Sequence, residues 1–250
     1  MRTRGDNVAQ PFRAANVNSV TQLLSIVIPA FNEERFIGTL LRQIADVDLE
    51  PLGVRKEVVV IDDHSSDRTA EIAAGFDGVI LKRLERNTGK GGAVRAGIEL
   101  STGDLLIIQD ADLEYNPQDY VPMVRALLEG RGDIVYGSRY LRAGRHANQS
   151  LAAYLGGRSL SVVARVFTGT WLTDTVTALK LFPRHVITAL TLTTTGFELD
   201  HEITAKCLAR GFRIVEVPVS YNPRSKEEGK KIGLRDWFIG MRTYFRFRNG

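Results

Sequence analysis

The sequence predicts an α/β protein in which one mostly parallel sheet is flanked by helices. Strand-like runs of aliphatic residues alternate four times with helical patterns within about 90 residues, as in the βα units of a doubly wound sheet. The run at residues 105–108 is apolar at every position, which is typical of a strand buried on both faces. The chain has 250 residues, 44% of them hydrophobic and 25% charged, so one such domain can fill its core.

The first half of the chain supplies this alternation. Pro29 ends the first strand, because proline lacks the backbone N–H that a central ladder needs. Asn32 is expected to start the first helix, since two glutamates follow it and acids are favoured in a first turn. The predicted strands span residues 23–29, 57–63, 78–84 and 105–108, and the helices after the first three span about 33–44, 67–75 and 89–100.

The second half is less regular. Its expected helices span residues 117–128, 151–167 and 197–210, and its strands span 133–139, 212–221 and a short part of 173–183. Neither a repeat nor a linker divides it from the first half, so a single domain is expected over residues 23–233. A disordered polar tail is expected at residues 1–22 and an amphipathic carboxyl-terminal helix at 234–250.

Composition narrows the class of protein. The one cysteine, Cys207, excludes an intramolecular disulfide and argues against a structural zinc site. No run of about 18 apolar residues suggests a membrane span, and the amino-terminal residues do not resemble a signal peptide, so a cytoplasmic protein is expected. Residues 224–248 contain eight basic and three acidic side chains, which indicates an anionic partner such as a phosphate or a membrane surface rather than nucleic acid.

Acidic side chains follow the buried strand at residues 105–108. Asp110, Asp112 and Glu114 stand at alternate positions, a spacing that also occurs in exposed acidic turns. Carboxylates that are withdrawn from water call for a cation, and oxygen ligands suit Mg²⁺ or Mn²⁺. The residues at the ends of the neighbouring strands decide between an exposed acidic turn and a metal site.

Two more polar clusters end the first two strands. Asn32 and Glu33 follow the first strand, and Asp62 and Asp63 end the second. Because ligands of open α/β sheets bind beyond the carboxyl ends of the strands, three polar clusters at one rim favour a binding site over a solvated surface.

Nine short motifs occur in an order that resembles the inverting family-2 glycosyltransferases, which have the GT-A (Rossmann-like) fold. They are similar in particular to the polyprenyl- and dolichyl-phosphate sugar synthases, a branch that includes the dolichyl-phosphate mannose synthases. The resemblance spans roughly residues 24–236. The motifs are residues 26–33 (IVIPAFNE), 60–67 (VIDDHSSD), 87–91 (NTGKG), 109–113 (QDADL), 137–139 (GSR), 173–174 (TD), 196–198 (GFE), 216–221 (EVPVSY) and 228–232 (EGKKI) after Arg224.

The resemblance implies transfer of a sugar, mannose before glucose, from GDP-mannose or UDP-glucose to a polyprenyl or dolichyl phosphate with Mg²⁺ or Mn²⁺. It implies a metal site at Asp110, Asp112 and Glu114, and catalytic roles for Asp112, Arg139 and Asp174. The implied donor-binding residues are Pro29, Phe31, Glu33, Asp62, Asp63, Lys90 and Asp110. The implied acceptor-phosphate residues are Arg139, Arg224 and Lys231, with Lys230 beside them.

Two basic residues have alternative roles. Lys90 opens a helix behind a glycine-rich loop, so the loop N–H groups and Lys90 could bind an anion, or the glycines could serve only close packing. Arg139 ends a strand at the rim, where its guanidinium suits a phosphate but could equally pair with Asp112 or Asp174.

The acceptor decides whether a general base is needed. A phosphate monoester is already ionised near neutral pH, whereas a hydroxyl acceptor must lose a proton. Asp174 and Glu198 are therefore expected to orient groups or pair with arginine, and Asp174 is the first candidate base if the acceptor is a saccharide or soluble hydroxyl. A nucleotide-sugar-binding module without turnover is the third hypothesis.

Two departures from the family pattern leave the donor open. His64 is expected to be a hydrogen-bonding cap in its turn, and Ala178 stands where glycine is common. The carboxyl-terminal helix mixes aromatic residues with arginines, which suits an anionic membrane surface, docking on the core, or recruitment of a membrane-embedded partner. A peripheral location on the cytoplasmic face of a membrane is the resulting expectation.

Overall fold

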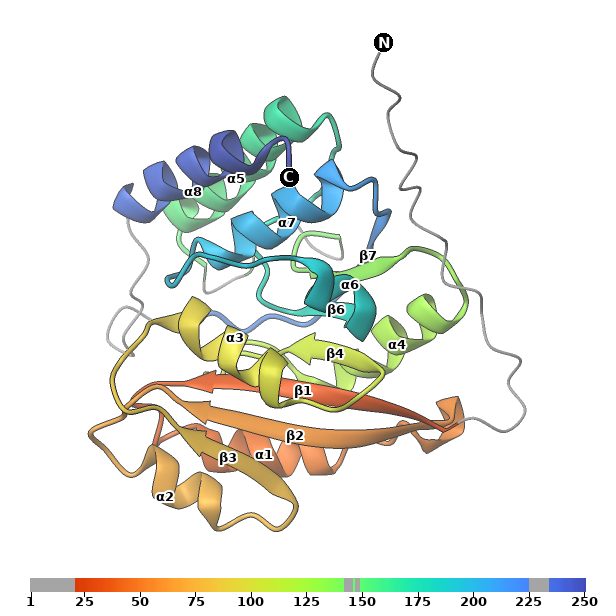
Figure 1. Cartoon of the computed structure of the whole chain (residues 1–250). Coiled ribbons are helices and arrows are strands. Elements are labelled where there is room, and N and C mark those ends of the chain that lie inside the picture. The colour runs from red at the N-terminus through yellow and green to blue at the C-terminus, as the bar shows by residue number, and fades with distance from the viewer. Residues whose placement is uncertain (1–20, 142–145, 147–148, 225–233) are drawn as a thin grey trace.

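The computed structural model describes residues 21–141, 146, 149–224 and 234–250. Most of the expected tail and Lys230 and Lys231 therefore lie outside the described residues. The described part forms a seven-stranded sheet in the order β3-β2-β1-β4-β6-β5-β7 (Figure 1). The strands are β1 (Gln22–Ala30), β2 (Val54–Asp62), β3 (Val79–Arg83), β4 (Leu105–Ile108), β5 (Ile134–Ser138), β6 (Lys180–Pro183) and β7 (Ile214–Pro218).

The sheet is mostly parallel, which confirms the predicted fold class. β1 lies inside the sheet and pairs in parallel with β2 on one side and with β4, the middle strand of the seven, on the other. β6 runs antiparallel between β4 and β5, a reversal that the sequence pattern did not specify. The chain winds outward from β1 through β2 to β3 and then returns to β4, so the β1–β4 boundary is a switch point of the kind at which α/β sheets bind ligands.

Helices cover both faces of the sheet (Figure 1). Residues of α1 (Ile37–Ala45), α2 (Thr69–Ala74) and α4 (Tyr120–Leu128) share one core cluster with the sheet. Residues of α3 (Lys90–Leu100), α6 (Arg184–Ala189) and α7 (Leu199–Ala209) pack in clusters on its other face. Two short 3₁₀ turns complete the connections, η1 (Glu50–Leu52) and η2 (Pro117–Asp119).

Burial on both faces explains why the inner strand β1 is mostly apolar, with Gln22 and Ser25 as its polar residues. Ile26 and Ile28 belong to the core on one face and Val27 to the core on the other, and all three are fully buried. Each such side chain stabilises the fold by about 1.5–3 kcal/mol through burial alone.

Two further helices form an outer layer. α5 (Leu151–Thr168) and α8 (Leu234–Phe247) lie side by side and pack on α7 through Ala164, Ala205 and Tyr244 (Figure 1). In the part of the chain that the structure describes, none of the helices combines the length and apolar character needed to cross a membrane.

The start of the first helix differs from the prediction. α1 begins at Ile37, and its N-cap Phe36 makes no side-chain capping bond. Asn32 instead has a left-handed backbone, with φ 55°, in the loop that leaves β1. Its side chain accepts a hydrogen bond from the Ser66 N–H, so asparagine serves a loop contact 34 residues away instead of a helix cap.

Candidate active site

The polar loops after β1 and β2 are joined to each other. The Asn32 N–H donates to Ser65 Oγ over 2.9 Å, and the Glu33 N–H donates to Thr69 Oγ1 over 2.8 Å. These bonds fix the backbone on which Phe31 and Glu33 stand. Phe31 is 36% exposed at the rim, where a flat ligand could contact its ring.

The two acids that follow β2 are both buried and have different partners. Asp62 accepts from the Ser65 N–H and lies 3.2 Å from Arg83 Nε. Asp63 accepts from the Thr88 N–H, at 2.7 Å, and from the Gly89 N–H, at 2.8 Å. Asp63 therefore holds the glycine-rich loop in place. A direct contact between Asp63 and the nucleotide-sugar donor stays a prediction.

The N–H groups of this loop are engaged within the protein. Those of Gly91 and Gly92 donate to the Thr195 carbonyl, at 2.7 and 3.3 Å. A Cβ at Gly91 would lie 2.6 Å from the Thr194 carbonyl oxygen, and one at Gly89 would lie 2.5 Å from that of Thr195. Of the two readings of this motif, the structure shows close packing for the glycines.

Lys90 nevertheless faces the candidate metal site. Its Nζ lies 2.7 Å from Asp110 Oδ1 and 3.4 Å from Asp200 Oδ2. Burial lowers the pKa of Lys90, but the charges of Asp110 and Asp200 outweigh it and hold that pKa above its ordinary value. Lys90 is therefore a fixed cation beside the first acid of the motif.

Asp200 and Lys180 extend this ion pair into the core. Lys180 is fully buried, and its Nζ lies 2.5 Å from Asp200 Oδ1. Sequence reasoning missed both residues. The sequence feature that could have identified them is Asp200, because it is an acidic residue in a helix predicted to pack on the sheet, two positions after Glu198.

The second acid of the motif pairs with a distant arginine. Asp112 Oδ2 accepts from Arg224 Nη2 over 2.8 Å, and Arg224 Nη1 lies 3.1 Å from Glu33 Oε2. Burial, then the charges of Asp110 and Glu114, raise the pKa of Asp112 to about 7, although Arg224 opposes them.

The third acid is held by the segment after β7. Glu114 Oε2 accepts from Tyr221 Oη at 3.0 Å, and its Oε1 accepts from the Arg224 N–H at 2.8 Å. Among the described residues, no three His, Cys, Asp or Glu side chains already form a metal cage. Mg²⁺ commonly takes only one or two protein carboxylates and fills its shell with water and phosphate oxygens, so Asp110 and Asp112 fit such an ion.

Arg139 and Asp174 form a buried bidentate pair. Arg139 Nε and Nη2 donate to the two Asp174 oxygens at 2.6 and 2.7 Å, and the Arg139 N–H donates over 3.1 Å. Of the two predicted partners, Asp174 is the one observed, since Asp112 pairs with Arg224. Glu216 accepts from the Thr173 and Asp174 N–H groups and so holds the turn that presents Asp174.

The other residues named from the sequence have contacts near their own positions or in neighbouring segments. Glu198 Oε1 accepts from the Gly196 N–H at 3.2 Å, so it braces its own loop. His64 Nδ1 lies 3.2 Å from the Leu84 carbonyl, so its observed partner is in another segment and not in its own turn, where a cap was expected. Ala178 is buried and donates its N–H to Tyr115 Oη over 3.3 Å. Pro29 lies at the end of β1, paired with Ile61.

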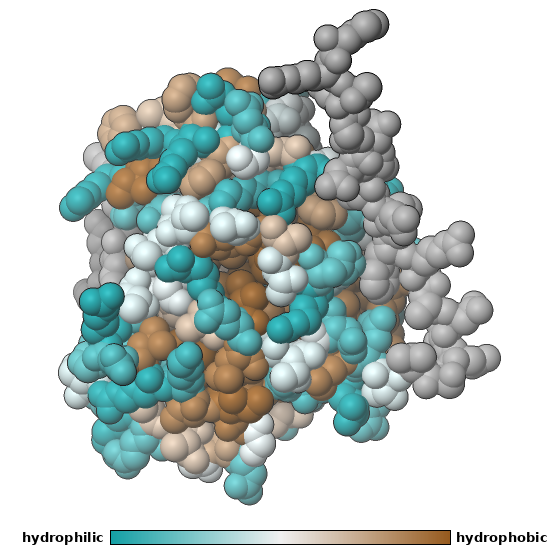
Figure 2. All heavy atoms as spheres, viewed as in Figure 1, coloured by the Kyte–Doolittle hydropathy of each residue, from teal (hydrophilic) through white to brown (hydrophobic). Residues whose placement is uncertain are grey.

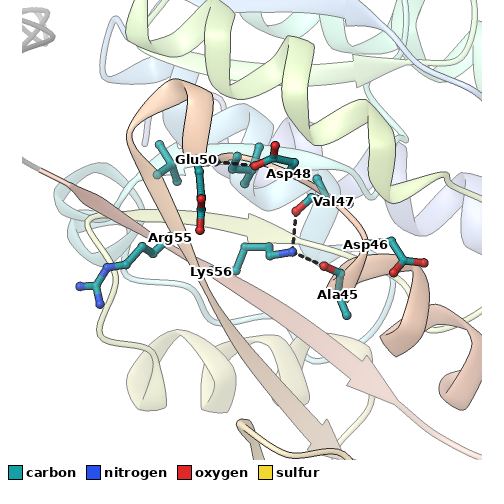
Figure 3. A pocket seen from close by; sticks show the side chains of 9 residues that line it. Ala45, Asp46, Val47, Asp48, Glu50, Arg55 and Lys56 are labelled. Carbon is teal, nitrogen blue, oxygen red and sulfur yellow. Dashed lines mark hydrogen bonds between the residues drawn. The ribbon is translucent and has the colours of Figure 1, made fainter.

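A cavity of about 320 Å³ lies away from this rim, at the amino end of β2 (Figure 3). Lys56 reaches across it and donates to the carbonyls of Ile44 and Ala45, each at 2.7 Å, and of Val47, at 2.5 Å. Ile44 and Ala45 are the last two residues of α1 and Val47 lies just beyond them, so Lys56 caps the carboxyl end of the helix. This cavity therefore has a structural explanation.

The model of the family "Glycosyl transferase family 2" matches residues 25–183, which include the polar clusters at the ends of β1, β2 and β4 and the Arg139–Asp174 pair. The chain belongs to this family. An uncharacterized protein of Methanocaldococcus jannaschii is 31% identical over 214 residues, 83% of this chain and 85% of that protein. Dolichol-phosphate mannosyltransferase of Pyrococcus furiosus is 28% identical over 216 residues, 84% of this chain and 59% of that protein.

A third relative also carries a lipid-phosphate name. An undecaprenyl-phosphate 4-deoxy-4-formamido-L-arabinose transferase of Pseudomonas aeruginosa is 34% identical over 220 residues, 85% of this chain and 61% of that protein. This family-2 chain thus spans less than two thirds of the length of either of these two named transferases.

Solved structures show the GT-A fold of this family-2 chain. Glucosyl-3-phosphoglycerate synthase from Mycobacterium tuberculosis, crystallised with Mn²⁺, UDP and glucosyl-3-phosphoglycerate, superposes with a TM-score of 0.68 at 22% identity and covers 92% of this chain and 80% of its own. Mannosyl-3-phosphoglycerate synthase from Rubrobacter xylanophilus gives 0.69 at 19% identity, with coverages of 90% and 72%. The predicted fold is therefore confirmed.

Proposed function

We propose that this glycosyltransferase moves a hexose, mannose before glucose, from a nucleotide-diphosphate sugar to a polyprenyl or dolichyl phosphate with inversion. The donor is GDP-mannose or UDP-glucose, and the ion is Mg²⁺ or Mn²⁺. The names of the Pyrococcus and Pseudomonas relatives support a lipid-phosphate acceptor. The reaction takes place at the cytoplasmic face of a membrane.

The observation that carries the acceptor class is the enclosed position of Asp174. This side chain is fully buried, and both of its oxygens accept hydrogen bonds from Arg139. A base for a hydroxyl acceptor must reach the proton that it removes, which Asp174 cannot do in this pair. A phosphate acceptor is already ionised and attacks the anomeric carbon directly, so it needs positioning instead of a base.

Asp110 and Asp112 would hold the divalent ion, with Glu114 as the third candidate ligand. The bound ion would act as a Lewis acid that offsets charge on the nucleotide leaving group. Lys90 adds a fixed positive charge next to Asp110. Phe31 and Glu33 would contact the nucleoside from the loop after β1, with Pro29 and Asp62 behind them.

The outer helices α5 and α8 support the proposal that the protein binds a membrane surface. α8 docks with one face, where Trp237 Nε1 donates to Ser159 Oγ at 2.8 Å and Tyr244 is buried. Its opposite stripe exposes Phe238, at 59%, and Phe245, at 53%. The exposed residues that accompany them are Arg235 and Arg242 on α8, and Leu151, Leu155, Val162 and Val166 on α5.

Figure 2 shows hydrophobic side chains between strongly hydrophilic ones over this outer layer, at the upper left. Apolar side chains flanked by arginines suit the boundary between head groups and acyl chains of an anionic bilayer. Two of the three expectations for the carboxyl-terminal helix, docking on the core and contact with a membrane surface, thus have support. Its inner face contacts the core, and its outer face exposes Phe238 and Phe245.

The test is sugar transfer by the full chain. Radiolabelled GDP-mannose and UDP-glucose are each incubated with polyprenyl phosphate and Mg²⁺, and the lipid extract is counted. Label is expected in the extract with one of the two donors, and none is expected when polyprenol replaces polyprenyl phosphate. Transfer only to a hydroxyl acceptor, or nucleotide binding without any product, would overturn the proposal in favour of the second or third hypothesis.

A further inference from the structure

Arginines and aromatic rings alternate between the predicted metal-binding acids and helix α5. Tyr221, whose hydroxyl bonds to Glu114, has its ring centroid 5.0 Å from Arg139 Cζ. Arg139 Cζ also lies 5.4 Å from the ring centroid of Tyr140. Arg158 of α5 contacts the same Tyr140 ring, with Cζ 5.6 Å from its centroid.

The series ends at an exposed ring. Arg158 Cζ lies 5.3 Å from the ring centroid of Trp171, and Trp171 is 42% exposed. Arginine over an aromatic face is attracted by the ring and keeps its N–H groups free in the plane of the guanidinium. The contacts therefore present a line of cations from the α5 surface toward the rim.

Tyr140, which lies between the two arginines, is fixed from several sides. Its hydroxyl is so close to α5 that a Cβ at Gly157 would lie 2.8 Å away. Tyr154 packs edge-on against it, with centroids 5.4 Å apart, and Gln149 Nε2 donates to its hydroxyl over 3.3 Å. The separation of Arg139 and Arg158 is therefore set by a packed ring.

The charges of the two arginines are balanced differently. Arg139 forms a bidentate pair with Asp174. Arg158 donates one bond, from Nη1 to the Thr173 carbonyl at 2.8 Å, and no ion pair joins it to a carboxylate within the described ranges. A half-buried guanidinium with donors to spare next to a second arginine is suited to a dianion.

We propose that Arg158 is a binding residue for the acceptor phosphate and contacts it before it reaches Arg139. This inference rests on the proposed lipid-phosphate acceptor and adds a residue that no motif of the sequence indicated. The same helix exposes Leu155, Val162 and Val166, so a lipid whose tail lies along that face brings its phosphate to the level of Arg158. The bond to Thr173 fixes Arg158 beside the turn that contains Asp174.

The experiment compares three variants of the full chain, Arg158→Gln, Arg158→Lys and Arg165→Gln. Arg165 is the matched control, because it lies two turns further along α5 and its Cζ is also close to the Trp171 ring, at 5.8 Å. Among the described residues it makes neither a ring contact with Tyr140 nor a hydrogen bond to Thr173. KM and kcat are measured for polyprenyl phosphate and for the nucleotide sugar. Farnesyl phosphate, farnesol and inorganic phosphate are then titrated as inhibitors.

Arg158→Gln is expected to raise the KM for polyprenyl phosphate and the inhibition constant of farnesyl phosphate by roughly tenfold or more, since a charge-assisted hydrogen bond is lost. The nucleotide-sugar KM, the kcat at saturating acceptor and inhibition by farnesol should change less than about twofold, since none of them uses this bond. Arg158→Lys keeps the charge and should recover part of the loss, and Arg165→Gln should match the wild type. Weak inhibition by inorganic phosphate in every variant would confirm that the lipid tail accompanies the phosphate.

Three results would contradict this assignment. Unchanged acceptor KM in Arg158→Gln overturns it while leaving the proposed function intact. Equal loss of farnesyl phosphate and farnesol binding shows that Arg158 only supports the Thr173 turn. A wild-type protein that does not distinguish farnesyl phosphate from farnesol overturns both this inference and the lipid-phosphate acceptor. If Arg158→Gln lowers the melting temperature markedly, Arg158→Lys is used in its place. In that folded variant the remaining loss of binding must affect farnesyl phosphate and not farnesol.

Discussion

Arg224 Nη2 lies 2.8 Å from Asp112 Oδ2, although the two residues are 112 positions apart in the sequence. The same guanidinium bonds to Glu33, so one cation joins the acid expected to bind the nucleoside to an acid expected to bind the metal. A divalent ion at Asp112 would compete with this arginine for the same carboxylate. Donor binding would then free Arg224 for the acceptor phosphate, the role that the family resemblance implies for it.

The competition predicts the effect of Arg224→Gln on metal binding. Without nucleotide, Mn²⁺ should bind this variant roughly tenfold more tightly than the wild type, because a positive charge next to Asp112 is removed. The measurement is titration of free Mn²⁺ by electron paramagnetic resonance. Arg213→Gln, which removes an exposed arginine 3.7 Å from Asp133, is the control and should change nothing. Weaker Mn²⁺ binding in Arg224→Gln would show that the arginine supports the metal site instead of competing for it.

Asp174→Asn distinguishes a structural partner from a general base. Breaking the buried pair leaves the Arg139 charge unbalanced and should lower the free energy of unfolding by about 3–5 kcal/mol in urea titrations. Glu71→Gln breaks an exposed pair with Arg68 and should leave stability unchanged. A normally stable Asp174→Asn protein whose kcat is lower by several decades would instead favour a hydroxyl acceptor.

Gly91→Ala tests the packing role of the glycine-rich loop. The new Cβ would lie 2.6 Å from the Thr194 carbonyl, so the variant should lose about 1–3 kcal/mol of unfolding free energy. Gly156→Ala is the matched helical control, because a Cβ there meets nothing within 4 Å and alanine favours a helix by about 0.8–1 kcal/mol. Equal stability changes in the two variants would argue against the close packing.

The buried His201 is expected to make the free energy of unfolding depend on pH. Burial lowers its pKa from 6.5 to about 4, even though Asp200 opposes the shift. Between these values the unfolded chain binds a proton that native His201 excludes, so the contribution of His201 to the free energy of unfolding should fall as the pH falls, by about 3 kcal/mol in total. The raised pKa of Asp112 acts in the opposite sense over the same range, so the His201 contribution is measured as a difference between variants.

Urea titrations at pH 7.5 and 5 of the wild type and of His201→Gln isolate this contribution, of which about 2 kcal/mol falls in that range. His201→Gln should therefore be less destabilised by acid than the wild type, and replacing the exposed His64 by glutamine should leave the wild-type response unchanged. Because His201 packs on Tyr244 with ring centroids 5.1 Å apart, the same acid titration reports on the docking of α8. Equal acid-induced changes of the free energy of unfolding in the wild type and His201→Gln would contradict the role of His201.

The exposed phenylalanines of α8 predict binding to lipid. Phe238→Ser combined with Phe245→Ser should lower partitioning onto anionic vesicles by roughly tenfold or more, since each buried ring contributes about 1.5–3 kcal/mol. Cosedimentation with vesicles of phosphatidylglycerol measures it. Ile80→Thr, at a 37% exposed position on β3, is the control and should bind like the wild type. Undiminished binding of the double variant would assign the membrane contact to another surface.

Local patterns of the sequence determined the fold class and the rim. The apolar run of β4 had to lie between covered faces, and alternation with helices required parallel strands whose carboxyl ends meet. These features depend on residue period and strand polarity, which a single sequence displays. The order of the motifs then indicated the family, and residues 25–183 match its model.

The tertiary structure alone decided which partners the charged groups take. Arg139 had two predicted partners and pairs with Asp174. Lys90 pairs with both Asp110 and Asp200, and Asp200 is a residue that the sequence pattern did not indicate. The antiparallel course of β6 and the two-sided environment of α8 were decided in the same way. The physical reason is that ion pairs and helix contacts depend on distance in space between segments up to 191 residues apart, as in Glu33 and Arg224, and sequence period says nothing about that distance.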